Sequence, residues 1–120
     1  MIADRIRESI SSETVIPKPK AKADFIVKAQ GKRRGETALI YRIPNHKNPG
    51  KSSEKGITDS EFEKAFAELQ RSRKSTRAWF NKHLPNCAKE GSCNFTTIGG
   101  IFTLLGEATY SSPGVYERRE

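Results

Sequence analysis

Apolar side chains in the second half of the chain recur at the spacing of helices that bury one face. The first such segment follows Thr58 and Glu61, whose spacing fits a capping box, and its helix is predicted to run to about Gln70. The apolar residues of this segment fall on a single stripe. They are Phe62, Ala65, Phe66 and Leu69. The pattern predicts an amphipathic helix that packs against a core.

A second helix is predicted immediately downstream. Ser75 or Thr76 can cap its start, and Pro85 ends it because proline lacks the amide hydrogen that a helix interior needs. Trp79 and Phe80 lie on this helix. They fit either the core or a platform on which the bases of a single strand stack, and the polarity of the rest of the helix favours the core.

Residues 86–94 are predicted to be a loop, and the chain then ends in a helix and a hairpin. The helix is capped by Thr96 or Thr97 and stops at Gly106, because glycine readily ends a helix. Its inner side is formed by Ile98, Ile101, Phe102 and Leu105. The strands of the hairpin are expected at residues 107–110 and 115–119.

Two runs rich in strand-forming residues, 24–30 and 37–43, occupy the first half of the chain. The segment between them starts at Gly31 and contains Gly35, so the two runs predict a hairpin with a glycine-flanked tip. The tip is basic: Lys32, Arg33 and Arg34. Residues 44–56 are rich in asparagine, proline, glycine and serine, and they are predicted to form a polar loop.

The first ten residues predict a helix with one narrow apolar stripe. Ile2, Ile6 and Ile10 recur every four residues, and this stripe needs a surface to lie on, either the rest of the domain or a second copy. Pro17 and Pro19 alternate with lysines, which predicts an extended, solvated linker over residues 11–23. We therefore expect an N-terminal arm and linker (residues 1–23) and a single compact α+β domain (residues 24–120). Removal of residues 1–22 is expected to leave the fold intact.

Three helices followed by a terminal hairpin resemble winged helix-turn-helix domains over residues 57–119, about half of the chain. The resemblance rests on the order of the elements and on Gly106 and Gly114. It implies a winged-helix-like three-helix core with a terminal β-hairpin, preceded here by a basic β-hairpin and an N-terminal helical arm. The link from Leu84 to Thr96 departs from the family's pattern, because the simplest helix-turn-helix has a tight turn at this point.

The resemblance also implies that the last helix enters the major groove of DNA. Its outward residues would be Thr96, Thr97, Gly100 and Thr103, and threonine side chains can donate to and accept from base edges. No arginine or lysine lies on this helix to pair with guanine, so most of the affinity must come from other residues. Gly99 and Gly100 permit a close approach, either to phosphate or to another helix or chain.

Positive charge is concentrated in two segments of a chain whose net charge is +8. Residues 18–34 contain seven basic residues against one acid, and residues 71–89 contain six basic residues and no acid. Segregated charge favours a polyanionic partner. We therefore expect a non-enzymatic domain that binds nucleic acid, DNA in preference to RNA, in a regulatory or targeting role. The candidate binding residues are Lys32, Arg33, Arg34, Arg71, Arg73, Lys74, Arg77, Thr97, Thr103 and Arg118.

A protein-interaction or adaptor domain is the alternative. It would form a homo-oligomer through Ile2, Ile6 and Ile10 or through Gly99 and Gly100, and its charge would serve solubility or an acidic protein partner. Salt dependence separates the two hypotheses, because a protein that neutralises several phosphates loses affinity steeply as salt rises.

The remaining chemistry is sparse. Cys87 and Cys93 lack the close spacing of paired zinc ligands, His83 and His46 are the only histidines, and we expect two reduced cysteines without metal or cofactor. Neither a cluster of carboxylates for a metal-dependent nuclease nor a phosphate-binding glycine loop is present. No apolar run is long enough for a membrane span, and no leader segment is evident, so we expect a cytoplasmic location.

Overall fold

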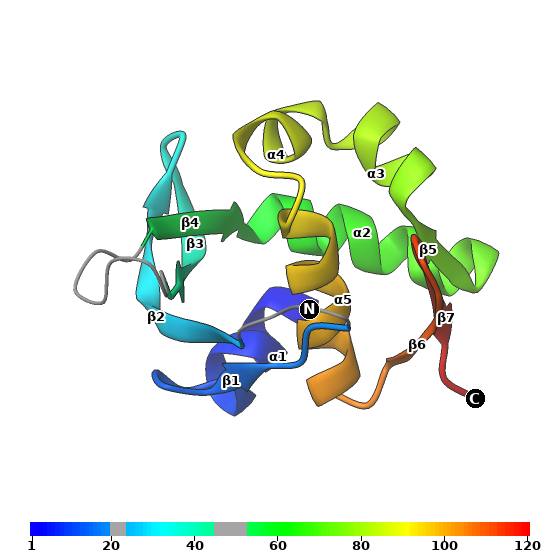
Figure 1. Ribbon diagram of the computed structural model, residues 1–120, viewed down its shortest axis with the longest axis horizontal. Coiled ribbons are helices and arrows are strands. Elements are labelled where there is room, and N and C mark those ends of the chain that lie inside the picture. Colours follow the sequence, from blue (N-terminus) through cyan, green and yellow to red (C-terminus); the bar gives the residue numbers. More distant parts are fainter. Residues whose placement is uncertain (20–23, 45–52) are drawn as a thin grey trace.

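Two antiparallel sheets and five helices make up the part of the chain that the computed structural model describes, which is residues 1–19, 24–44 and 53–120. One sheet has the strand order β1-β2-β3-β4 and the other β5-β7-β6 (Figure 1). The protein therefore has a mixed α+β fold. None of the helices in these residues has the length and apolar character needed to cross a bilayer.

The predicted basic hairpin is confirmed as the centre of the first sheet. Strands β2 (Phe25–Arg33) and β3 (Glu36–Ile43) are joined by Arg34 and Gly35, whose φ angles are +50° and +78°. Two positive φ angles in a two-residue loop match the right-handed twist of the strands, and glycine adopts one of them without steric cost. The sheet also contains β1 (Val15–Ile16) and β4 (Ser53–Thr58).

Strand β4 corrects part of the predicted polar loop. Residues 53–56 pair with β3, with Gly56 opposite Ile40 and Glu54 opposite Arg42, whereas residues 45–52 lie outside the described part of the chain. Serine, glutamate, lysine and glycine have low strand propensity, and pairing with β3 overrides it.

The predicted capping box is confirmed at the start of α2 (Asp59–Ser72). The Thr58 hydroxyl accepts from the backbone of Glu61 at 3.2 Å, and the Glu61 carboxylate accepts from the backbone of Thr58 at 2.9 Å. Phe62, Ala65 and Leu69 are buried as the stripe predicts. The helix ends at Arg73, whose φ of +66° turns the chain into the next strand.

A short strand and two helices follow α2. Strand β5 (Lys74–Thr76) leads into α3 (Arg77–His83), where Thr76 caps the first turn by accepting from the backbone of Trp79 at 3.2 Å. The predicted loop after Pro85 is wrong, because Pro85 instead starts α4 (Pro85–Glu90). Proline is favoured in the first turn of a helix, where its missing amide hydrogen would have no partner.

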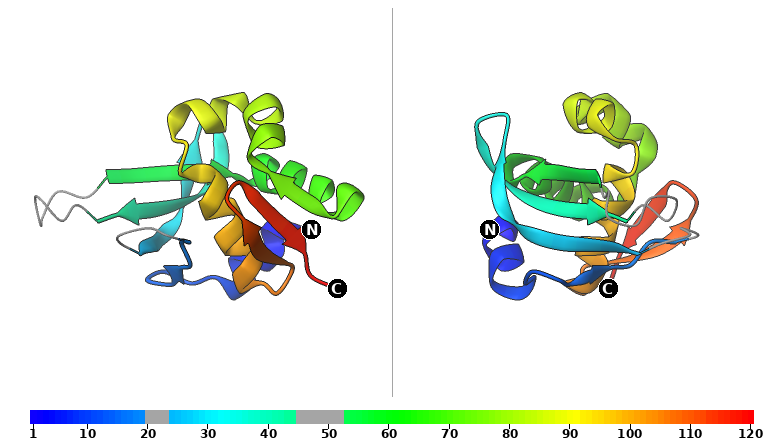
Figure 2. Two further views of the ribbon diagram at one scale, coloured as in Figure 1. Left: turned by 45° about the vertical axis from the view of Figure 1, so that its right-hand side comes forward. Right: turned by 60° about the vertical axis from the view of Figure 1, so that its left-hand side comes forward.

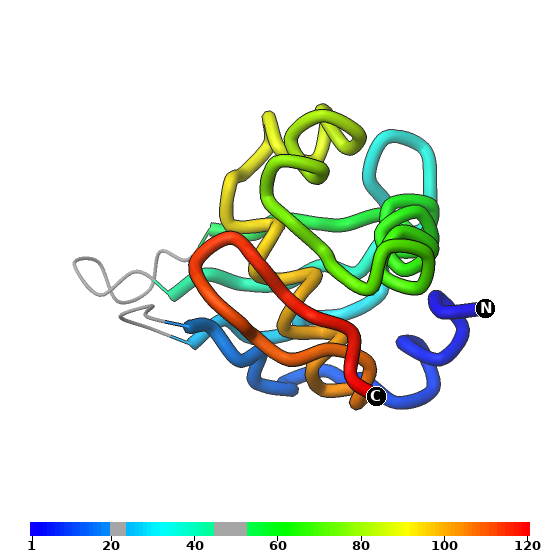
Figure 3. The backbone as a smooth tube through the Cα atoms, turned by 90° about the vertical axis from the view of Figure 1, so that its right-hand side faces the viewer, coloured from blue at the N-terminus to red at the C-terminus, as the bar shows by residue number. Residues whose placement is uncertain are grey.

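The predicted helix and hairpin at the end of the chain are confirmed as α5 (Asn94–Leu104), β6 (Ala108–Ser112) and β7 (Val115–Arg118). The predicted cap at Thr96 or Thr97 is wrong, because both lie inside the helix, where their hydroxyls donate to the Cys93 carbonyl oxygen. Gly106 and Gly114 both have φ near +77°. Strand β7 also pairs with β5, so the hairpin is anchored to the segment between α2 and α3. Figure 3 shows this hairpin crossing in front of α5.

Helix α5 lies between the two sheets and is the centre of the core (Figures 1 and 2). Its Phe95 ring packs edge-on against Phe80 and Tyr116, and its Phe102 ring packs against Phe66 and lies near Phe62. Of the two hypotheses for Phe80, burial in the core is confirmed. A helix that is covered on most sides has few positions left for a ligand.

The N-terminal segment packs on this same core. Helix α1 (Ile2–Ser9) lies against α2, and Ile2, Ile6 and Ile10 belong to the core cluster. The stripe of isoleucines therefore lies on the domain. Within the described part of the predicted solvated linker, residues 11–19, Val15 and Ile16 form strand β1, and Ile16 is fully buried. The solvated linker was predicted from its prolines and lysines, but Val15 and Ile16 pair with β2 and so make this segment part of the sheet.

Candidate nucleic-acid interface

The helix predicted to enter the major groove has its expected outer face covered. Thr97 is 0% exposed, and Gly100 is buried against residues 16–19, here called the strap. A β-carbon at Gly100 would lie 2.7 Å from both the Ile16 side chain and the Pro17 carbonyl oxygen. The prediction that Thr97 and Gly100 face outward is therefore wrong. The strap, which the sequence placed in a solvated linker, occupies that face.

The two adjacent glycines allow close packing within the chain. A β-carbon at Gly99 would lie 2.2 Å from the ring of Tyr116, which is closer than any real contact, while Gly100 admits the strap on another side of α5. Thr103 is half-buried, and its hydroxyl donates to the Gly99 carbonyl oxygen at 2.7 Å. The packing supports the prediction that the glycines permit a close approach. In both cases the approaching group belongs to this chain: Tyr116 at Gly99 and the strap at Gly100.

Lys18 fixes the strap to the first turn of α5. Its ammonium donates to the Cys93 carbonyl oxygen at 2.9 Å and to the hydroxyls of Thr96 and Thr97 at 2.7 Å each. It also lies 4.0 Å from the centre of the Phe25 ring, within the range of a cation–π contact. Burial lowers the pKa of Lys18 to about 7. Sequence reasoning counted Lys18 only as part of a basic segment, because nothing local distinguishes it from its solvated neighbours.

A buried polar chain continues from α5 toward the first sheet. The Tyr41 hydroxyl donates to the Asn94 side chain, whose amide donates to the Cys87 carbonyl oxygen at 2.9 Å. Burial raises the pKa of both Tyr41 and Cys87. Both cysteines are free, and in the described residues no group of three or more metal-ligating side chains comes together. His46 lies outside the described residues.

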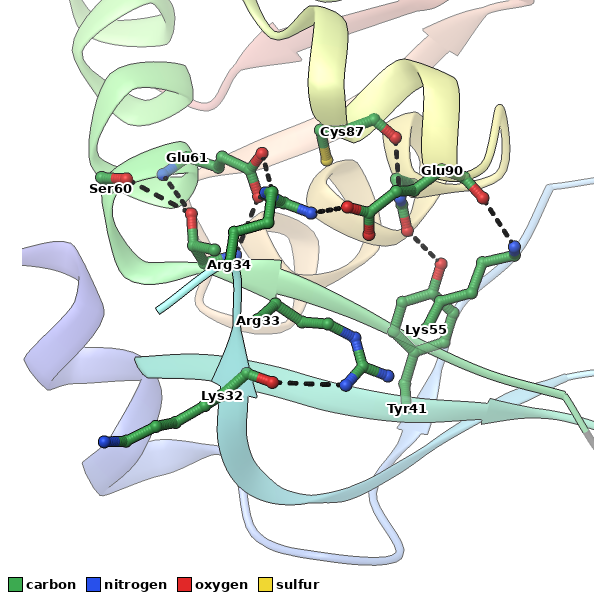
Figure 4. A network of polar contacts seen from close by, with 11 residues as sticks. Lys32, Arg33, Arg34, Tyr41, Lys55, Ser60, Glu61, Cys87 and Glu90 are labelled. Atoms are coloured by element: carbon green, nitrogen blue, oxygen red, sulfur yellow. Dashed lines mark hydrogen bonds and ion pairs between the residues drawn. The ribbon is translucent and has the colours of Figure 1, made fainter. Parts of the chain in front are cut away.

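The tip of the basic hairpin is partly neutralised. Arg34 donates to both carboxylate oxygens of Glu61 at 2.7 Å and forms a second ion pair with Glu90 (Figure 4). This guanidinium joins the hairpin to the start of α2 and the end of α4. Arg34 is therefore a structural cation, and its predicted role as a free ligand for phosphate is not supported by its contacts.

The other two residues of the tip are less constrained. Lys32 is exposed, and Arg33 is partly buried, with its guanidinium donating to the Lys32 carbonyl oxygen at 3.3 Å (Figure 4). In the described part of the chain neither has a carboxylate partner. The stem of Arg33 covers Gly56, so part of this side chain serves packing.

The second basic segment is exposed. Its cations come from the end of α2, β5, α3 and α4, elements that follow one another along the upper and right-hand border of the ribbon in Figure 1. We call this surface the basic edge, and it consists of Arg71, Arg73, Lys74, Lys82 and Lys89. Arg71 pairs with Glu68 at 2.6 Å and Arg73 lies 3.8 Å from Glu120. No ion pair in the described residues involves the three lysines.

Two further candidates flank the basic edge. The β5–β7 pairing brings Arg118 beside Arg73, with the Arg118 amide donating to the Arg73 carbonyl oxygen at 2.9 Å. Arg77 is turned away, since its guanidinium donates to the Ser92 carbonyl oxygen at 2.9 Å and lies over the Phe95 ring. The structure thus places Arg118 beside Arg73, whereas Lys74 lies opposite Glu117 in the same strand pair, and Arg77 holds the segment before α5.

The surfaces predicted for oligomer formation are covered within the single chain. Ile2, Ile6 and Ile10 lie in the core, and Gly99 and Gly100 are buried against Tyr116 and the strap. The alternative hypothesis of an adaptor domain therefore loses the two surfaces on which its self-association depended.

Comparison with known proteins gives no relative: no family model, no curated protein and no solved structure matches this chain. The interface therefore has to be argued from its own geometry and charge.

Proposed function

We propose that this chain is a non-enzymatic, winged-helix-type domain that binds duplex DNA chiefly through phosphate contacts of the basic edge, in a regulatory or targeting role. The observation that carries the proposal is the exposure of Lys74, Lys82 and Lys89 in a segment, residues 71–89, that contains no acidic residue. Free cations gathered on one edge attract a polyanion and release its counterions on binding.

The winged-helix part of the proposal is supported by the order of elements after Thr58. Helices α2, α3 and α5 precede a terminal hairpin, and that hairpin pairs back to β5 and so becomes part of the helical domain. Helix α4 is an addition to the three expected helices. Because α5 is buried and carries no basic residue, the proposal does not require α5 to read bases.

Phosphate contacts position a protein on a duplex without reading its sequence. We therefore expect binding that discriminates weakly between duplexes and weakens steeply with salt. A domain that makes about three contacts should show a slope near −3 when the logarithm of affinity is plotted against that of salt concentration, at roughly 0.9 per contact.

The test is a triple variant, Lys74→Ala, Lys82→Ala and Lys89→Ala, measured by fluorescence anisotropy on a labelled duplex across a salt series. We expect affinity at low salt to fall at least about tenfold and the salt slope to shrink by roughly 2–3. The control variant, Arg5→Ala, Lys28→Ala and Arg42→Ala, removes the same charge from residues that are already ion-paired. Equal losses in the two variants would show that only net charge matters and would overturn the assignment of the basic edge.

A further inference from the structure

A pocket of about 260 Å³ opens where the strap passes the terminal hairpin. Its walls come from three parts of the chain: the strap, the second half of α5, and strands β6 and β7. The lining residues are Pro17, Lys18, Pro19, Thr103, Tyr110 and Tyr116. A volume below that of sites for drug-sized ligands suits a single small ring system.

The walls of this pocket are mainly rings held in fixed positions. Tyr116 is buried, with its ring against Gly99 and its hydroxyl donating to the Thr96 carbonyl oxygen at 3.5 Å. Tyr110 stands edge-on to Tyr116, with ring centres 5.6 Å apart and planes at 75°. Two prolines complete the apolar lining. Rigid rings lose little conformational entropy when a flat ligand stacks on them.

The polar groups of the pocket suit a neutral heterocycle attached to an anionic chain. Thr103 gives its hydroxyl hydrogen to α5 and keeps an oxygen that can accept, and the hydroxyl of half-buried Tyr110 can both donate and accept. Among the described residues that line the pocket, the ionisable groups are Lys18 and the two tyrosines, and none is a carboxylate. A cationic ligand is therefore disfavoured.

We propose that this pocket binds one unpaired nucleobase of a nucleic acid strand. The assignment rests on the proposed function for the choice of a nucleobase over other flat rings. Bases stack on aromatic side chains irrespective of their identity, and the worth of such stacking corresponds to about fivefold to 100-fold in affinity per base. A strand that reaches the pocket would therefore be held through a base here and through phosphates elsewhere.

The pocket is tested directly with thymidine, which carries a base and no phosphate. In an NMR titration we expect chemical-shift changes confined to the strap, Thr103, Tyr110 and Tyr116. Tyr110→Leu should abolish these changes, and Tyr110→Phe should retain them because the ring remains. Circular dichroism confirms that each variant is folded. No local shift change at millimolar thymidine in the folded wild-type protein overturns the proposal, whatever the duplex experiments show.

A second measurement separates the pocket from the basic edge. Anisotropy compares a ten-nucleotide thymidine strand with a strand of the same length that lacks its bases, so both carry the same phosphates. Wild type should prefer the base-containing strand about fivefold or more, and Tyr110→Leu should remove that preference. The triple lysine variant should weaken both strands equally. Equal binding of both strands by wild type would overturn the proposal. If neither the strands nor the duplex bind, but thymidine still changes the chemical shifts of the pocket residues, the proposed function is overturned and the proposal for the pocket is not.

Discussion

The two basic segments of the chain differ in what their charges do. In residues 18–34, Lys18 donates to α5 and Arg34 is neutralised by Glu61 and Glu90, so both side chains are engaged within the fold. In residues 71–89, the three lysines of the basic edge are exposed and have no ion-pair partner in the described residues. A run of positive charge in a sequence therefore gives the number of cations and leaves open which of them are available to a ligand.

The same contrast explains why α5 is unsuited to enter the major groove, which is the role implied by its place in the order of elements. The strap covers one side of α5 and Tyr116 the other, whereas α3 and α4 stand at an edge with their lysines in solvent. A helix in the centre of a core supports stability, and a short helix at the edge can present charge.

Deletion of residues 1–19 removes Lys18 together with four buried isoleucines, Ile2, Ile6, Ile10 and Ile16. Each buried isoleucine contributes about 1.5–3 kcal/mol, and the whole domain is expected to be stable by about 5–15 kcal/mol. We expect the truncated chain to lose cooperative thermal unfolding, measured by circular dichroism. This outcome is opposite to the sequence-based expectation that the arm is dispensable.

The control for the deletion is Arg5→Ala with Glu8→Ala, which alters the exposed side of α1 and leaves its isoleucines in place. Its melting temperature should stay within a few degrees of wild type. If the deleted chain instead keeps a cooperative transition close to that of wild type, residues 24–120 form a domain without the arm.

Arg34→Ala leaves the carboxylates of Glu61 and Glu90 without their shared partner. Glu61 is nearly buried, so we expect a loss of about 2 kcal/mol in the free energy of unfolding, measured in urea. Arg34→Lys should recover only part of this, because a single ammonium does not replace the two guanidinium nitrogens, of which Nη2 donates to Glu61 and Nη1 to Glu90. The neighbouring exposed Lys32→Ala should cost less than about 0.5 kcal/mol. Equal costs at the two positions would contradict a structural role for Arg34.

Lys18 should make stability depend on pH in the alkaline range. Burial lowers its pKa in the folded chain to about 7 from the ordinary 10.5. Between these two pKa values the unfolded chain binds more protons than the folded chain, so the free energy of unfolding rises with pH. The rise is complete above the unfolded pKa, where Lys18 is neutral in both states. The slope is at most about 1.4 kcal/mol per pH unit. Urea unfolding of wild type and Lys18→Met from pH 7 to 10 should show this rise in wild type alone, and parallel curves would argue that Lys18 stays charged.

Local patterns predicted the elements whose signals lie within a few residues. The capping box at Thr58, the turn at Gly35, the helix stop at Gly106 and the turn at Gly114 are each confirmed. Pairing between distant segments accounts for what was missed. Strands β1, β4 and β5 have little strand propensity or length of their own, and they form because β2, β3 and β7 lie beside them.

The candidate site could be predicted only in part, for the same reason. Lys74 is exposed, as a binding residue must be, but Arg34, Arg77 and Thr97 have contacts that no local pattern reveals. Lys18 and Tyr110 were not singled out for the contacts they make, because the strap meets α5 and the hairpin across about 80–90 residues of sequence.

From the sequence alone came four of the five helices, all but α4, together with the two hairpins and the close approach at Gly99 and Gly100, since each follows from residue chemistry over one or two turns. The tertiary structure decided which side of α5 is covered, which cations are neutralised, and where a pocket opens. Those outcomes depend on which segments meet, and contacts between distant segments form only when the whole core is buried together.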